Sequence, residues 1–195
     1  MKAWLLMGLF FAALSASLLS NADTRDGDDE EPDTRTIHVN SIATLQLAID
    51  RARAGDTIIL ENGKYTTSEF IQVVRRNGTQ QKPIIIRAQS ILGVEIHGTH
   101  GFSLRSSNHV TIKGFKFKHE RGHNIIQNGL FNRYTRNYFD GYGVGDDVTV
   151  RGSNSEVSYN KFTWTSSGLA REGGEMVHIL ETAGLKAATD VKVFR

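Results

Sequence analysis

The chain has 195 residues, of which 39% are hydrophobic and 23% charged, and its formal net charge is +2. This length supports one hydrophobic core and leaves little room for a second domain. Because the sequence contains no cysteine, disulfide bonds and a lipoprotein anchor are excluded, and core packing must supply the stability.

The first 22 residues have the pattern of a secretory signal peptide. A single cation, Lys2, precedes an apolar run from Ala3 to Leu19, and Ser20-Asn21-Ala22 supplies small residues where a signal peptidase cleaves. We expect cleavage before Asp23 and a secreted or periplasmic protein. The alternative is an uncleaved membrane anchor, but the apolar run is short for a membrane span.

Residues 23–35 form an acidic segment, with seven acids and two arginines and a net charge of −5. Such a run without large apolar residues is typical of a disordered linker. Residues 36–195, which remain as the folded part, carry a net charge of +6. A basic exported domain suits an acidic polysaccharide, because positive potential concentrates anions, although ordinary surface charge explains the balance equally well. We expect neither a nucleic acid partner nor a stable membrane anchor.

Residues 41–54 predict one amphipathic helix at the start of the folded part. Ser41 or Thr44 can serve as its N-cap, and Gly55 ends it. The apolar residues that recur at helical spacing are Leu45, Ala48, Ile49 and Ala52.

From residue 56 onward, the sequence predicts strands only. They are short, rich in Val, Ile, Phe and Thr, and separated by Gly, Asn and Ser. The expected strands are residues 56–60, 84–87, 94–97, 110–117, 147–151, 156–162, 175–180 and 190–194.

A short sequence pattern that recurs at a regular spacing decides the fold class. It occurs as Gly114-Phe115-Lys116-Phe117, Arg136-Asn137-Tyr138-Phe139 and Tyr159-Asn160-Lys161-Phe162, so the final phenylalanines are 22 and 23 residues apart. This period predicts an all-β, right-handed parallel β-helix in which the three phenylalanines form one buried column. The asparagines should form an internal ladder. A β-sandwich also has short strands, but it requires no such period.

The end of the chain falls within this repeat. Residues 193–195 match Tyr134-Thr135-Arg136, after which the earlier coil continues with Asn137. A solenoid needs a cap over its last coil. We therefore expect residues 36–195 to be the N-terminal portion of a longer β-helix domain.

The order of these segments resembles polysaccharide lyase family 6, which contains the alginate lyases and chondroitinase B. The resemblance covers about residues 39–195. It rests on the helix followed by Ala54-Gly55-Asp56-Thr57-Ile58-Ile59-Leu60, Asn62-Gly63-Lys64-Tyr65, Lys82-Pro83-Ile84-Ile85-Ile86-Arg87-Ala88-Gln89, Val110 to Phe117 and Val148-Thr149-Val150-Arg151-Gly152-Ser153-Asn154.

This resemblance implies β-elimination on a uronate-containing polysaccharide such as alginate or chondroitin/dermatan sulfate. The family uses a calcium ion held by Asn and Glu side chains, a lysine base and an arginine, on coils that we expect beyond Arg195. The nearest local candidate, Glu172 to His178, does not fit, because Val177 stands where a second glutamate is required. We therefore assign no catalytic residue and no calcium ligand in this chain.

Three residues are candidates for binding the polysaccharide. His178 matches Thr149 in the preceding coil, and both are expected to face outward on one sheet. Arg151 and Arg171 flank the same strands and could pair with uronate carboxylates. Ordinary surface positions explain all three as well.

Two classes of function remain open from the sequence. The first is a polysaccharide lyase, inactive in this piece because its catalytic coils lie further along. The second is a non-catalytic carbohydrate-binding or surface β-helix, or a protein related to the pectate lyases. A downstream Glu-x-Glu followed by lysine, then an Arg-His pair, would favour the lyase.

Overall fold

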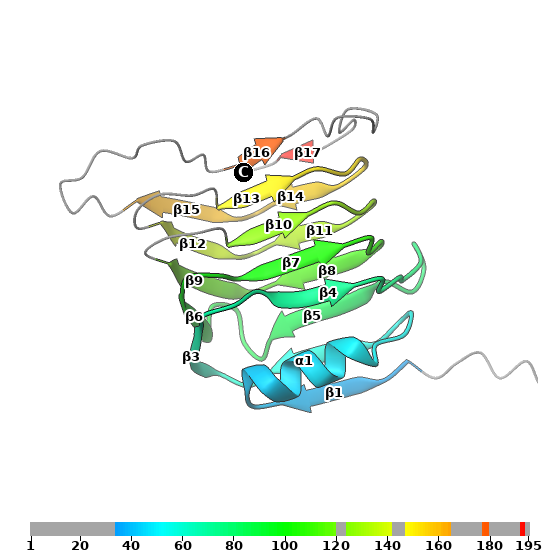
Figure 1. The fold of residues 1–195 in the computed structure, drawn as a ribbon, viewed down its shortest axis with the longest axis horizontal. Coiled ribbons are helices and arrows are strands. Elements are labelled where there is room, and N and C mark those ends of the chain that lie inside the picture. The colour runs from blue at the N-terminus through cyan, green and yellow to red at the C-terminus, as the bar shows by residue number, and fades with distance from the viewer. Residues whose placement is uncertain (1–33, 120–123, 142–146, 165–176, 180–191, 194–195) are drawn as a thin grey trace, which may run out of the picture. The chain divides into compact units, whose positions relative to one another are not determined.

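The computed structural model describes residues 34–119, 124–141, 147–164, 177–179 and 192–193. They form a right-handed parallel β-helix with one short helix at its N-terminal end (Figure 1). Its strands belong to three parallel sheets, which we name sheets A, B and C.

The strands are distributed over the sheets as follows. Sheet A contains β1 (Thr36–Val39), β2 (Thr57–Leu60), β5 (Ile84–Ala88), β8 (Val110–Lys113), β11 (Arg133–Thr135), β14 (Glu156–Ser158) and β17 (Lys192–Val193). Sheet B contains β3 (Gly63–Thr67), β6 (Val94–Gly98), β9 (Phe115–His119), β12 (Tyr138–Gly141) and β15 (Lys161–Trp164). Sheet C contains β4 (Ile71–Val74), β7 (Phe102–Arg105), β10 (Ile125–Gln127), β13 (Val148–Val150) and β16 (Val177–Ile179).

From the second coil onward, hydrogen-bonded neighbours in every sheet are three strands apart along the chain, so three strands complete one coil. The strand pairs are parallel, as in β5 with β8 and β8 with β11. A β-sandwich, which is built from antiparallel sheets, is therefore excluded. The predicted solenoid is confirmed.

Alternation along each strand separates the core from the outer surface. In β5, Ile84 and Ile86 are fully buried, whereas Arg87 lies on the opposite face and is partly exposed. Burial of each such isoleucine stabilises the fold by roughly 1.5–3 kcal/mol. β8 repeats this alternation in register with β5, so the outward positions of successive strands form rows along the sheet.

The three repeated phenylalanines lie in one column inside sheet B. Phe117 is opposite Phe139, and Phe139 is opposite Phe162 in the strand register. Their ring centroids are 5.0 and 4.9 Å apart, with the rings within 7° and 10° of parallel. The predicted column is confirmed, but Phe162 is only partly buried, because β15 is an edge strand of sheet B.

The repeated asparagines link successive coils through their side chains. The Asn137 Oδ1 accepts a hydrogen bond from the Phe115 N–H (3.0 Å), and its Nδ2 donates to the Ile112 carbonyl (3.1 Å). Asn160 makes the equivalent bonds with the Asn137 N–H and the Tyr134 carbonyl, both at 2.8 Å. The expected ladder is present, and it runs from amide side chain to backbone.

Two predicted strands are each divided by a corner. Residues 110–117 break at Gly114 (φ 81°), and residues 156–162 break at Tyr159 (φ 52°). Arg136 (φ 56°) occupies the matching position in the coil between them. A single residue in the left-handed region turns the chain from sheet A into sheet B. The apolar pattern continues on both sides of the corner and therefore did not reveal it.

Several short strands were not predicted from the sequence. These strands are β1, β3, β4, β7, β10 and β11, which have three to five residues each. A strand of this length contains only one or two inward positions, which is too few to establish a period of two.

Helix α1 (Ile42–Asp50) covers the first coil and is shorter than predicted. The Ser41 hydroxyl caps it by accepting a hydrogen bond from the Thr44 N–H (3.1 Å), and the Thr44 side chain accepts one from the Ser41 N–H (3.1 Å). Residues 51–54 leave the helix because the Asp56 carboxylate accepts a hydrogen bond from the Arg53 N–H within a turn. The buried residues of α1 are Leu45, Ala48 and Ile49.

Arg35, which the sequence analysis placed at the end of the linker, is attached to the first coil. Its Nε donates to Asp56 Oδ1 at 3.0 Å, and the Asp56 side chain is almost fully buried. Burial alone would raise the pKa of this carboxyl, but the hydrogen bonds from Arg35 and Arg53 outweigh burial and lower the pKa. The predicted signal peptide at 1–22 and the predicted linker up to residue 33 lie outside the described residues.

None of the helices in the described ranges has the length and hydrophobicity of a membrane span.

Candidate functional site

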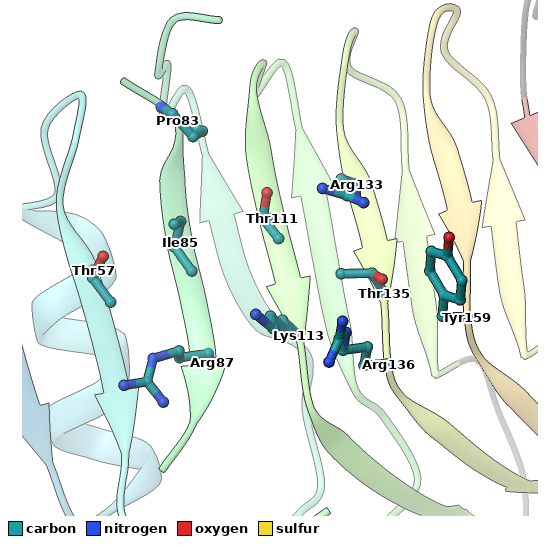
Figure 2. Close-up of a pocket in the computed structure, with 10 residues that line it drawn as sticks. All are labelled: Thr57, Pro83, Ile85, Arg87, Thr111, Lys113, Arg133, Thr135, Arg136 and Tyr159. Atoms are coloured by element: carbon teal, nitrogen blue, oxygen red, sulfur yellow. The ribbon is translucent and has the colours of Figure 1, made fainter. Parts of the chain in front are cut away.

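A groove of about 390 Å³ lies on the outer face of sheet A (Figure 2). Its lining comes from four strands and from the corners that follow β11 and β14, and we call it the sheet A groove. The lining residues are Thr57, Pro83, Ile85, Arg87, Thr111, Lys113, Arg133, Thr135, Arg136 and Tyr159.

The strand register places cations from successive coils next to each other. Arg87 of β5 is directly opposite Lys113 of β8, and Lys113 is opposite Thr135 of β11. Adjacent strands are about 4.8 Å apart, so the first two side chains start one strand spacing apart. Arg136 follows Thr135 at the corner. Like charges at this spacing repel each other, and an anion bound between them would remove the repulsion.

Few carboxylates offset this positive charge. Arg133 pairs with Glu156 (Nε to Oε1, 3.0 Å), and both side chains are substantially exposed. Arg87 donates to the backbone carbonyls of Ala88 and Gln89. Within the described ranges, no acidic side chain lies at ion-pair distance from Lys113 or Arg136 of the sheet A groove.

The outer face of sheet B is also rich in charge, but much of this charge is internally paired. Glu95 Oε2 lies 2.7 Å from Lys116 Nζ, and Glu95 also contacts His97 and Lys64. The hydrogen bond from Lys116, with a further one from His97, lowers the pKa of Glu95 to about 2 despite its partial burial. An external anion would have to compete with Glu95 for these cations. Sheet A therefore offers the better site for a polyanion.

The corner residues Arg136 and Tyr159 are held outward by the backbone. Each is followed by a ladder asparagine whose side chain fixes the chain to the neighbouring coil. Arg136 is exposed, and Tyr159 is 63% exposed. A guanidinium and a phenol are therefore presented at one end of the sheet A groove, where they can bind a carboxylate and pack against a sugar ring.

The residues proposed from the sequence lie elsewhere. Arg151 is exposed directly after β13, and His178 lies in β16 opposite Thr149, so both belong to sheet C or its end. Arg171 is outside the described residues. Val148 and Val150 lie in the core cluster, as the expected outward direction of Thr149 requires, but Thr149 is only 1% exposed and offers no open surface. Alternation gives the direction of a side chain but not what covers it. The binding roles of Arg151, Arg171 and His178 remain predictions.

The groove cations were missed because their proximity depends on strand register. Arg87 and Lys113 are 26 residues apart, outside the 22- to 23-residue repeat, since one coil contains a longer turn. Arg136 and Tyr159 could have been identified, because each directly precedes an asparagine of the repeated pattern. Two residues at the same outward corner on successive coils must lie side by side.

The described part of the chain does not fit a calcium ion. Calcium requires six to eight oxygen ligands, usually with several carboxylates. No group of three or more His, Asp or Glu side chains able to hold a metal occurs in the described ranges. The charged residues that line the sheet A groove are cations, and the amides of Asn137 and Asn160 are used by the backbone. No chemical step is therefore assigned to calcium here.

Comparison with known proteins gives one family match and several relatives. The model of the chondroitinase B family matches residues 39–139. The chain is 37% identical over 103 residues to pectate lyase PEL9 of Emericella nidulans, which is 50% of this chain and 23% of that enzyme. It therefore spans about a quarter of the length of this relative.

Solved structures share the fold. A variant of the alginate lyase AlyGC, of polysaccharide lyase family 6, superposes with a TM-score of 0.61 and 23% identity, covering 66% of this chain and 19% of that one. A polysaccharide lyase of family 6 from Pseudopedobacter saltans superposes with a TM-score of 0.52 and 18% sequence identity. The match covers 81% of this chain and 46% of that one. At these identities the likeness establishes the parallel β-helix and nothing about substrate.

Proposed function

Since this chain belongs to the chondroitinase B family, we propose that it is part of a secreted polysaccharide lyase that cleaves a uronate-containing polymer by β-elimination. The family relationship supports the reaction class. Secretion is supported by the signal-like sequence at residues 1–22. The activity of the whole protein and its substrate are both parts of this proposal.

The observation that carries the proposal is the unbalanced positive charge of the sheet A groove. β-Elimination begins when the uronate carboxylate is neutralised, because this makes the adjacent C–H proton more acidic. Arginine and lysine side chains can bind such carboxylates through charge-assisted hydrogen bonds. Lys113 and Arg136 are suited to hold the polymer, since neither is paired with a described carboxylate.

Several uronate polymers are candidate substrates. Alginate and chondroitin/dermatan sulfate are expected from the family resemblance, and the similarity to a pectate lyase adds polygalacturonate. All three polymers carry regularly spaced uronate carboxylates, which are the groups that the sheet A groove can recognise.

Binding of matched acidic and neutral polymers tests this proposal. Polygalacturonate, alginate and dermatan sulfate should be compared with highly methyl-esterified pectin, which keeps the sugar backbone but lacks most of the charge. We expect at least one acidic polymer to bind more than about tenfold more tightly than esterified pectin at about 0.15 M salt. Equal affinity for esterified pectin would contradict the proposal.

Product formation separates a lyase from a binding protein. Elimination leaves an unsaturated uronate that absorbs in the ultraviolet. We expect this 195-residue chain to bind without forming product, because no residue here matches the family's base, acid and calcium ligands. Rapid product formation would show that a catalytic set lies within the chain. The calcium requirement is proposed for the whole protein, so a chelator should leave binding by this chain unchanged.

A further inference from the structure

A second groove, of about 330 Å³, lies at the corner between sheets A and B, and we call it the corner groove. Three of its lining residues are exposed apolar or aromatic side chains: Ile91 (53%), Leu92 (39%) and Tyr159 (63%). Arg136 and Tyr159 line both grooves, so the corner groove continues from the end of the sheet A groove.

A glycine in the row of corner residues makes room for Ile91 beside the corner groove. Gly114, Arg136 and Tyr159 occupy equivalent positions in three successive coils, each two residues before a paired residue of sheet B. A Cβ atom at Gly114 would come within 3.3 Å of the Ile91 side chain. The Ile91 side chain therefore lies over Gly114, where a larger residue would crowd it, and it is exposed there as a wall of the corner groove.

Three lining residues of the corner groove have an uncommon backbone conformation. Leu92 has φ 62°, close to the values of Arg136 (56°) and Tyr159 (52°). Left-handed backbone is unfavourable for a branched apolar residue. The Leu92 N–H donates to the Gly114 carbonyl (2.7 Å), which ties it to the next coil. Leu92 is thus held outward at the corner at a conformational cost.

Cations flank this apolar surface. Arg136 and Lys161 are exposed at the sheet B side, and Lys161 Nζ lies 5.2 Å from the centroid of the Tyr138 ring. An apolar platform beside two cations matches a uronate unit, which has an apolar C–H face and a negative carboxylate.

We propose that the corner groove binds a second segment of the acidic polysaccharide, which runs from the sheet A groove around the corner to Leu92 and Lys161. This inference rests on the proposed function, because the same polymer must occupy both grooves. The apolar face of a sugar would pack against Leu92 and Tyr159, and its carboxylate would contact Arg136 and Lys161.

Oligogalacturonates of graded length test the continuity of the two grooves. The variants are Leu92→Asn, which keeps a residue tolerant of left-handed backbone, and Lys161→Gln. Lys64→Gln is the matched control, because Lys64 lies in the same row of sheet B and loses the same charge. Lys113→Gln reports on the sheet A groove alone.

We expect Leu92→Asn and Lys161→Gln to weaken the binding of long oligomers about fivefold. Their affinity for the shortest oligomer that binds should stay within about twofold of that of the unmodified chain. Lys64→Gln should change neither. If Lys113→Gln weakens all lengths but the two corner variants weaken none, the corner inference fails and the proposed function survives. If Lys113→Gln also has no effect, the proposed function fails.

Two further outcomes would overturn the corner inference. The first is equal loss for short and long oligomers, because the corner groove would then be the primary site and not a continuation. The second is a dimer of the unmodified chain that Leu92→Asn converts to monomer in sedimentation velocity, since a second copy would then be the occupant.

Discussion

At the scale of single residues, the ladder asparagines add side-chain hydrogen bonds between successive coils. Asn137 is 1% exposed, and its amide satisfies one backbone donor and one backbone acceptor of the preceding coil. Loss of such an amide leaves both backbone groups buried without a partner, which costs more than one ordinary hydrogen bond.

We predict that Asn137→Ala lowers the free energy of unfolding by about 2–4 kcal/mol, measured by urea denaturation. Asn40→Ala, at an exposed asparagine before α1, should cost less than about 0.5 kcal/mol. Similar losses for the two variants would show that the ladder is not a major source of stability.

Glu95 makes the stability of the fold depend on pH. Its pKa is lowered from 4.5 to about 2, first by the Lys116 hydrogen bond and then by His97. Because the folded-state pKa is the lower one, the stabilisation is complete above about pH 4.5 and is lost as the pH falls toward 2. Partial solvent screening limits the stabilisation from Glu95 to about 1–3 kcal/mol.

Glu95→Gln should therefore destabilise the chain at neutral pH and remove part of the stability loss on acidification. Unfolding free energies of both proteins at about pH 6 and about pH 2.5 test this, with the exposed Glu69→Gln as control. If the two proteins differed in free energy of unfolding by the same amount at both pH values, the ion pair between Glu95 and Lys116 would not be the source of the pH dependence.

At the scale of elements, the strand register sets both the core and the outer rows. The 22- to 23-residue repeat was sufficient to predict the phenylalanine column. The pairing of β13 with β16 followed instead from the match between Thr149 and His178, which are 29 residues apart. The repeat could not predict the corners, because the left-handed residues Gly114, Arg136 and Tyr159 share no side-chain chemistry. It also could not align Arg87 with Lys113, which lie in a coil of different length.

Substitutions in the phenylalanine column should show graded costs. Phe139 is fully buried between two stacked rings, so Phe139→Ala should lower the free energy of unfolding by about 3–5 kcal/mol. Phe162, on the edge strand β15, is only partly buried, and Phe162→Ala should cost about half as much. A larger cost at Phe162 in the same denaturation measurement would contradict the observed order of coils.

At the scale of the whole molecule, the net charge and its distribution carry different information. The charge of +6 over residues 36–195 suited an anionic partner and ordinary surface charge equally well, and it gave no location for a binding site. The folded coils pair Lys116 with Glu95 on sheet B and leave Lys113 and Arg136 without described carboxylate partners on sheet A. Location therefore required the three-dimensional arrangement, because pairing is decided by neighbours from other coils.

The most direct test of the sheet A groove compares two double variants that lose the same charge. Lys113→Gln with Arg136→Asn removes both unpaired groove cations. Lys64→Gln with Arg75→Asn removes an exposed lysine and an exposed arginine elsewhere, and Arg75 has the same left-handed backbone as Arg136 (φ 53° and 56°). The measurement is equilibrium binding of polygalacturonate at about 0.15 M salt.

We predict that the groove variant binds at least about tenfold more weakly than the unmodified chain, whereas the control variant stays within about twofold. Equal weakening in both variants would show that polygalacturonate responds only to overall charge, and it would contradict a specific binding site on sheet A.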